Sequence, residues 1–444
     1  MTTCLWGTLC GGALGAVRTR AAALHLLAKG RALEAAGVPS LPGSDHWGIL
    51  ASGKPALAGA LFFGLSLGLG TGALTTLWVE ATRRPGAGRG GWAPWTVLLA
   101  PLAGALSGDW GLAAALALVA AGALRAAGDP TPRGAAAGRR LACAAVAALG
   151  LVPWLLAPEG AFTRLRDRWL LSGPGLGVDH FYYRWTLYPA EALKALAAES
   201  QPVGDIGALP ASAARSFAAQ VLPLRVLALA TPAPAADFAV ELREGTPVVV
   251  AGRIREAWPG SAAEQRRVWQ RLSQKADRAA PLRTATAMAL FVGCPLGLAW
   301  ALGSLCLWVA GRVAPARPVA PFVFAALLAT VLAAAGTPSP ECTARSPTTP
   351  EAVRAALASR SALTRFYGAR AAASLGTAQS EPLIAALGDP VVNVRYAAVE
   401  TLGATGGTGV EEALVGLVRG PEEWYVKERA YAALWRLGWR PVNL

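Results

Sequence analysis

The sequence predicts a polytopic α-helical membrane protein with six or seven spans, an extramembrane α/β domain and a C-terminal array of helical repeats, an α-solenoid. The membrane class follows from composition, because 54% of the 444 residues are hydrophobic and only 15% are charged. Soluble domains are about a quarter charged, and the mean hydropathy here is +0.40. The helical array is predicted by a short sequence motif that recurs three times near the C-terminus.

Apolar stretches long enough to cross a bilayer predict the spans, since a span needs about 20 apolar residues. They divide into an N-terminal region, 1–158, and a transmembrane hairpin, 284–336. The predicted spans are 56–79, 93–107, 110–124, 141–157, 285–311 and 318–336. Residues 4–17 are apolar but short and precede Arg18, so they predict either a seventh span or an interfacial helix.

Two stripes of small residues lie inside the apolar segments. Gly64, Gly68 and Gly72 recur at every fourth position of one span, and Gly7, Gly11 and Gly15 do so near the N-terminus. Such stripes let membrane helices approach backbone to backbone. They predict helix–helix contacts, either between spans of this chain or with a partner subunit. Asp109, in the turn of a predicted hairpin, is expected to be solvated or to cap a helix rather than to mark an ion path.

Basic residues in short loops predict the membrane orientation. Nine of them lie in loops 80–91, 125–140 and 312–317, which places those loops in the cytoplasm. The soluble parts then lie together on the extracytoplasmic side of a bacterial inner membrane. Basic residues in segments 18–54 and 266–283 argue against this orientation.

The region 159–283 is predicted to be an extramembrane domain of mixed helices and strands. Strands are expected at Val226–Leu229, Phe238–Leu242 and Thr246–Ile254, where β-branched and apolar residues gather. Helices are expected at Pro189–Ala198, 211–220 and 261–280, the last with an apolar stripe opposite its cations. Residues 337–350 are rich in Pro, Ser and Thr and predict an extended linker to the repeats.

Each copy of the repeated motif is expected to end an amphipathic helix with Leu-Gly. The three copies are Arg370–Gly376, Arg395–Gly403 and Arg429–Gly438. The pattern of Arg395, Ala398, Leu402 and Gly403 resembles HEAT repeats of the phycobilisome-lyase-like subtype, over residues 351–444. The resemblance implies stacked helix pairs that bind a protein partner. Possible contact residues are Arg395, Trp424, Trp435 and Trp439. The tryptophans are alternatively the array's own C-terminal cap, and the array is expected to rest against region 159–283.

One polar-aromatic cluster stands out from the remainder: Asp179, His180, Tyr182, Tyr183, Arg184 and Trp185, followed by Tyr188. It predicts either a ligand or partner contact, with His180 as an acid–base group, or an aromatic belt with domain core. No second histidine or carboxylate pair accompanies it at a recognisable spacing, which favours the second interpretation.

The sequence predicts no cofactor and no metal site, because its six cysteines form no CxxC pair or Cys/His cluster. The net charge of +14 is assigned to membrane topology and lipid contact, since no nucleic-acid motif accompanies it. The favoured function is a non-enzymatic, membrane-anchored scaffold or assembly subunit. The alternatives are an enzyme of envelope or lipid metabolism that uses His180–Tyr188, and a transport complex component.

Overall fold

The computed structural model describes residues 2–82, 109–126, 134–149, 170–171, 178–231, 235–313, 319–336, 347 and 349–440. The chain forms two compact units, each assembled from three segments. The first unit comprises 1–18, 56–167 and 280–343, and the second comprises 19–55, 168–279 and 344–444. The predicted span 93–107 and most of the linker 337–350 lie outside the described residues.

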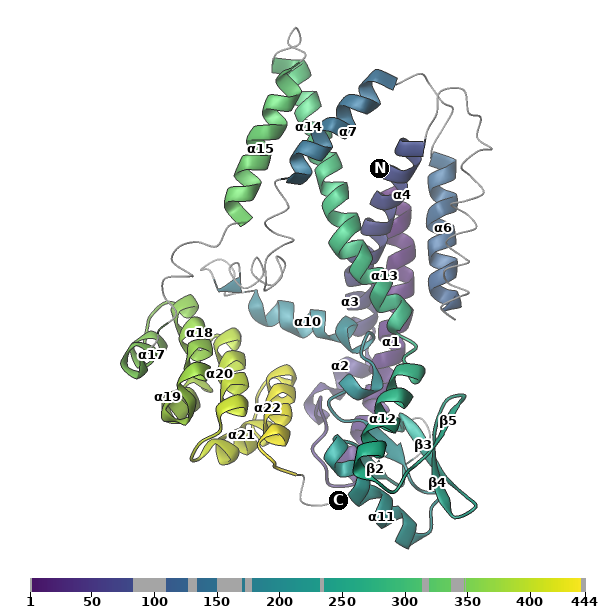
Figure 1. Cartoon of the computed structure of the whole chain (residues 1–444), viewed down its shortest axis with the longest axis vertical. Helices are drawn as coiled ribbons and strands as arrows, with labels where there is room; N and C mark the ends of the chain where they lie inside the picture. Colours follow the sequence, from purple (N-terminus) through teal and green to yellow (C-terminus); the bar gives the residue numbers. More distant parts are fainter. Residues whose placement is uncertain are drawn as a thin grey trace. The chain divides into compact units, whose positions relative to one another are not determined.

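The described part of the first unit is helical (Figure 1). It contains the first turns of α1 (Thr2–Ala35), α3 (Lys54–Phe63), η2 (Gly64–Gly68), α4 (Leu69–Thr82), α6 (Trp110–Ala126), α7 (Gly134–Leu149), α13 (Ala280–Met288), η6 (Ala289–Gly293), α14 (Cys294–Val313) and α15 (Ala320–Gly336).

Two of these helical runs are long and apolar enough to cross a membrane, Lys54–Leu77 and Ala280–Val313. They correspond to the predicted spans 56–79 and 285–311. The apolar stretches Trp110–Val119 and Ala320–Val331 are too short, and residues 4–17 are part of the long helix α1. The described residues therefore support two candidate spans, and six or seven are not supported.

The first unit brings glycines of neighbouring helices together and leaves several leucines exposed. A Cβ added at Gly11 would lie 2.8 Å from the Cα of Gly68, so α1 and η2 touch through their backbones. On the same α3–η2 run, Leu57, Leu61 and Leu65 are between 57% and 61% exposed. Asp109 accepts a hydrogen bond of 3.0 Å from the N–H of Leu112 at the start of α6, which is an N-cap geometry.

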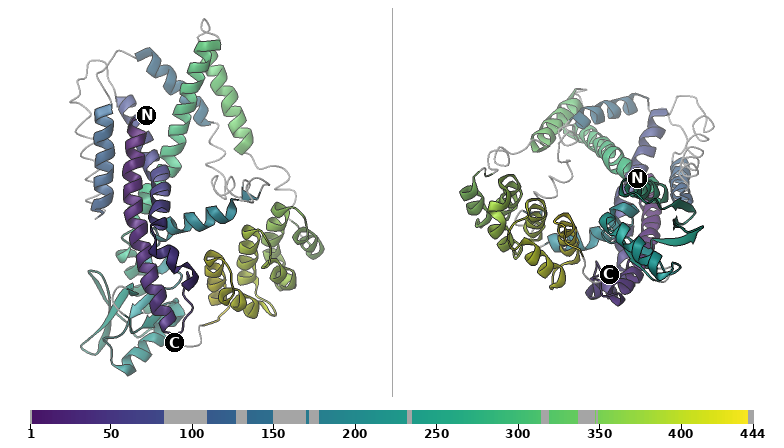
Figure 2. Two further views of the ribbon diagram at one scale, coloured as in Figure 1. Left: turned by 180° about the vertical axis from the view of Figure 1, so that it is seen from behind. Right: turned by 60° about the horizontal axis from the view of Figure 1, so that its bottom comes forward.

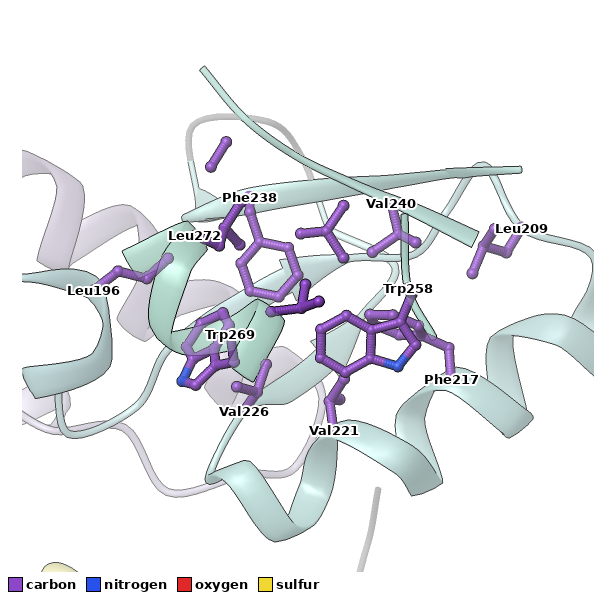
Figure 3. Close-up of a cluster of buried hydrophobic side chains, with 13 residues drawn as sticks. Leu196, Leu209, Phe217, Val221, Val226, Phe238, Val240, Trp258, Trp269 and Leu272 are labelled. Atoms are coloured by element: carbon purple, nitrogen blue, oxygen red, sulfur yellow. The ribbon is translucent and has the colours of Figure 1, made fainter. Parts of the chain in front are cut away.

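The second unit contains a five-stranded mixed sheet in the order β2-β1-β3-β4-β5. The strands are β1 (Val203–Asp205), β2 (Leu227–Leu229), β3 (Phe238–Arg243), β4 (Thr246–Ala251) and β5 (Ile254–Ala257). β1 runs parallel to β2 and β3, and β3, β4 and β5 are antiparallel neighbours. Helices α11 (Ala211–Val221) and α12 (Ala262–Ala276) supply Phe217, Trp269 and Leu272 to the core of this domain (Figure 3).

The observed elements correct three of the sequence predictions for this domain. The strand predicted at Thr246–Ile254 is a hairpin, because Gly252 has a φ of +63° and turns the chain between β4 and β5. The helix predicted at Pro189–Ala198 is instead the end of α10 (Asp179–Glu191) followed by a separate 3-10 turn, Leu196–Ala198. Strand β1, only three residues long, was not predicted. The other predicted strands and the helix at 211–220 are confirmed. The helix predicted at 261–280 ends earlier, at Ala276, and α13 begins at Ala280.

The C-terminal residues of the second unit form a stack of packed helices (Figure 2). They are α17 (Pro350–Leu357), α18 (Ala362–Ala371), η7 (Ala372–Gln379), α19 (Ser380–Ala386), α20 (Val392–Thr405), α21 (Val410–Arg419) and α22 (Trp424–Arg436). Leu402 is fully buried, as the repeat pattern predicts.

One helix end was predicted wrongly in this array. Gly403 does not end its helix, because α20 continues to Thr405 and turns at Gly406, which has a φ of +68°. Gly403 is instead a close-packing residue: a Cβ there would lie 2.9 Å from the Cα of Ala433 on α22. The remaining short elements of the second unit are η1 (Ser44–His46), α2 (Trp47–Ala51) and η4 (Leu222–Leu224).

A candidate docking site on the helical array

Helix α10 contains the polar-aromatic cluster that the sequence singles out, and it lies against α20 and α22 of the array. The tyrosine and arginine side chains of its middle turns face the first residues of those two helices. The contact is therefore made by two parts of the chain that are more than two hundred residues apart in sequence.

Tyr183 makes the first part of the contact. Its hydroxyl donates a hydrogen bond to Oδ1 of Asn393, which is buried near the start of α20. Its ring stacks on that of Tyr425, with 5.6 Å between centroids and 29° between planes. A buried amide oxygen destabilises the fold unless it accepts a hydrogen bond. Tyr183 of α10 supplies the donor to the Asn393 oxygen of α20.

Arg184 and Tyr188 make the second part, at the start of α22. The Arg184 guanidinium donates to Oε1 of Glu423 over 2.6 Å, and the Tyr188 ring stacks on Trp424 with centroids 6.1 Å apart. Burial raises the pKa of Tyr188 to about 12, against the attraction of Arg184 and with a further contribution from Glu423. Tyr188 is therefore a neutral packing group.

An ion cluster closes the contact at the end of α10. Lys194 pairs with Glu191 and, over 2.6 Å, with Glu428 of α22. The Ser200 hydroxyl also donates to Glu428. Burial works against the charge of Lys194, but attraction to the two carboxylates outweighs it and raises its pKa. For Glu191, burial dominates and raises the pKa to about 7.

Residues 350–435, which contain these array helices, match the family described as HEAT repeats. The C-terminal region consists of HEAT repeats. No curated protein and no solved structure shows a significant similarity to the chain.

The remaining predicted contact residues lie partly inside the HEAT array. Arg395 is buried, donates to the carbonyl of Asp389 over 2.7 Å and pairs with Glu422 over 3.0 Å. Trp435 is buried beside Tyr431. These side chains therefore brace the repeats from within.

The other aromatic residues of the predicted site are more accessible. Tyr182 packs edge-on against Tyr183, and Trp185, half-buried, lies beside Phe181. Asp179 and His180 belong to the first turn of α10, and their side chains lie outside the described part of the structure.

The HEAT array has a shallow hollow of about 480 Å³. Its lining residues are Gly407, Gly409, Glu411, Glu412, Val415 and Trp439. Each repeat pairs a first helix with a second helix, and the hollow lies at α21, a second helix. Helix α10 instead contacts the first helices α20 and α22.

A second buried ion cluster was missed by the sequence reasoning. Lys29 of α1 pairs with Glu199 and, over 2.8 Å, with Asp237, and His25 Nε2 lies 2.6 Å from the same Asp237. Burial opposes the charge of Lys29, but the two carboxylates outweigh it and raise its pKa. These partners are over 160 residues apart in sequence, so no local pattern could reveal them.

The contacts described at these sites are stacked rings, hydrogen bonds and ion pairs. Among the described residues, no group of three or more His, Cys, Asp and Glu side chains is placed to hold a metal ion. The groups that gather around α10 are aromatic rings and paired charges, which bind another helix.

Proposed function

We propose that the protein is a membrane-anchored scaffold or assembly subunit that docks a protein partner through its HEAT array. The observation that carries the proposal is the match to HEAT repeats at residues 350–435. HEAT arrays commonly mediate protein–protein interaction, because stacked helix pairs present an extended surface. The phycobilisome-lyase-like subtype stays part of the proposal, as a resemblance of sequence that carries no lyase chemistry.

The contact of α10 supports the proposal because it is an instance of this array binding a helix. It is a helix held in a HEAT surface by stacked rings and charge pairs, at Tyr183, Arg184 and Tyr188. Because those side chains are engaged by the array, they favour a scaffold over an enzyme that would use the same segment on a substrate.

The surface that we assign to the partner is the layer of second helices, α19 and α21, which α10 does not cover. It exposes Glu381, Glu411 and Glu412, and the last two line the hollow beside Trp439. Two carboxylates beside an indole ring suit a cationic side chain. The partner segment is therefore expected to be basic.

Membrane anchoring rests on the first unit. Two long apolar helices, Lys54–Leu77 and Ala280–Val313, are candidate spans. Gly64 and Gly68 are buried, whereas Leu57, Leu61 and Leu65 on the same α3–η2 run are exposed. Exposed leucines beside buried small residues are expected where lipid rather than water surrounds the helices. The proposal needs these two helices to cross the bilayer and does not depend on the further predicted spans.

The proposed location is a bacterial inner membrane, with the soluble parts on the extracytoplasmic side according to the basic loops. Extraction of membranes with alkaline carbonate tests the anchoring. Retention of the chain in the pellet is expected, and release into the supernatant would overturn the anchoring.

The docking surface is tested by affinity purification from solubilised membranes. The double variant E411K/E412K is expected to lose partners that the wild type retains, as is a chain without residues 351–444. The matched control is E244K/E351K, which makes the same charge change at exposed positions away from the hollow. Co-purification of the same partners with the truncated chain would show that the HEAT array is not the docking site.

A further inference from the structure

Helix α12 separates its side chains sharply between two faces. Val268, Trp269 and Leu272 are buried in the core of the sheet domain, with Trp269 against Phe238 at 5.6 Å between ring centroids (Figure 3). The opposite face is exposed and contains Arg266, Arg267, Gln270, Arg271, Gln274 and Lys275. Positions 266, 270 and 274 and positions 267, 271 and 275 form two adjacent rows along the helix. We call Arg266, Arg267, Arg271 and Lys275, together with Arg278 just beyond the end of the helix, the cationic face of α12.

Few carboxylates neutralise this face. Glu256 of the edge strand β5 pairs with Lys275 over 2.6 Å. Glu264, in the first turn, receives a hydrogen bond from Ser261, the residue that caps the helix. Asp277, the C-cap residue, accepts from the N–H of Ala279. In the described part of the chain, Arg266, Arg267 and Arg271 are exposed and form no ion pair with these carboxylates.

Helix α12 directly precedes a candidate membrane span in the chain. The helix ends at Ala276, and the candidate span begins at Ala280. The four chain steps from Ala276 to Ala280 can extend over at most about 14 Å. The end of α12 is therefore held by the covalent chain close to one end of the candidate span, where the headgroups of a bilayer would lie.

We propose that the cationic face of α12 binds the phosphate headgroups of anionic phospholipids. Arginine pairs with phosphate through two parallel N–H donors. Basic clusters next to a membrane span are attracted to an anionic leaflet, and the attraction grows with each added cation. The face carries no aromatic side chain on which a base could stack, so a nucleic acid is the less suitable polyanion. This inference rests on the proposed membrane anchoring and adds a lipid class to it.

The test measures binding of fluorescently labelled phosphatidylglycerol and phosphatidylcholine to the full chain in a neutral detergent. The wild type is expected to prefer phosphatidylglycerol, and 0.5 M NaCl is expected to weaken that binding. The variant R266Q/R267Q/R271Q is expected to bind it at least about tenfold less tightly. The matched control R215Q/R360Q/R419Q removes the same charge from exposed positions elsewhere and is expected to bind as the wild type does.

The proposal would be overturned by unchanged affinity in the α12 variant, by an equal loss in the control variant, or by equal binding of the two lipids by the wild type. A labelled DNA duplex that binds through the same arginines more tightly than the lipid would also overturn it, in favour of a nucleic-acid surface. Thermal melts of both variants are expected to match the wild type, because exposed substitutions change stability little.

Carbonate extraction separates this inference from the proposed function on which it rests. If the chain stays in the membrane but shows no preference for phosphatidylglycerol, only the α12 inference is wrong. If the chain is released, the membrane anchoring itself is wrong.

Discussion

Replacement of Glu191 by Gln is expected to stabilise the second unit at neutral and alkaline pH. Glu191 ends α10, and its side chain is only 9% exposed between Lys194 and the array. Burial raises its pKa most, attraction to Lys194 lowers it, and repulsion from Glu428 raises it, to about 7. A glutamine keeps the shape and the hydrogen-bonding oxygen of the side chain and removes the charge.

The magnitude follows from the pKa. A rise from 4.5 to about 7, at about 1.4 kcal/mol for each tenfold change in proton affinity, corresponds to about 3 kcal/mol. The folded state binds the proton more tightly than the unfolded state does. Protonation of Glu191 therefore stabilises the folded state fully at pH values below the pKa of this group in the unfolded chain. This stabilisation is lost as pH rises through about 7, the pKa in the folded state. The variant should be more stable than the wild type at pH 8 by about 1–3 kcal/mol, since part of the attraction to Lys194 is lost.

Thermal unfolding of the detergent-solubilised chain, followed by tryptophan fluorescence at several pH values, measures this difference. About 2–4 °C of Tm is expected for each kcal/mol in a domain of this size. E412Q is the matched control, because Glu412 is exposed on α21 and its replacement should leave the pH profile unchanged.

The reasoning is refuted if the difference in Tm between E191Q and the wild type is the same at pH 4.5 and pH 8. A variant less stable than the wild type at pH 8 would refute it as well, because the charged form of Glu191 would then contribute favourably.

The remaining predictions concern packing and buried charge. K29M should destabilise the second unit by about 3–5 kcal/mol in the same thermal assay, because it removes the buried cation that pairs with the buried Asp237 and the half-buried Glu199; a loss under 1 kcal/mol would contradict this. W424A should cost about 3–5 kcal/mol, since its indole is 2% exposed and stacks on α10, and limited proteolysis should then cut next to α10 faster. G68L should lower the Tm and yield of the chain because its side chain meets the α1 backbone, whereas G48L, at a glycine with open space, should not.

Periodicity predicted most of the elements because it depends on local sequence. The amphipathic pattern of α12 and the repeats of the array require only neighbouring residues to specify a helix and its buried face. The prediction was wrong where a single residue decides. Gly252 turns β4 into β5, and Pro189 lies in the last turn of α10. Gly403 was assigned to a helix end, but it permits α20 and α22 to approach.

The site could be predicted only in part. The sequence singled out the cluster around Tyr183 and Arg184 and the tryptophans of the last repeat as separate features. The structure joins Tyr188 to Trp424 and Arg184 to Glu423. The sequence around each partner does not reveal such a pair, because each residue taken alone could equally belong to an aromatic belt or to the cap of a helix.

The sequence by itself determined the apolar class of the first unit, the helical repeats and the cationic face of α12, since composition and periodicity act residue by residue. Tertiary structure alone decided which surfaces of the HEAT array remain open. It placed α10 on α20 and α22, left α19 and α21 exposed, and buried Lys29 between Glu199 and Asp237. The physical reason is that a desolvated charge or ring is stabilised by whichever partner the fold brings to it, at any distance along the chain.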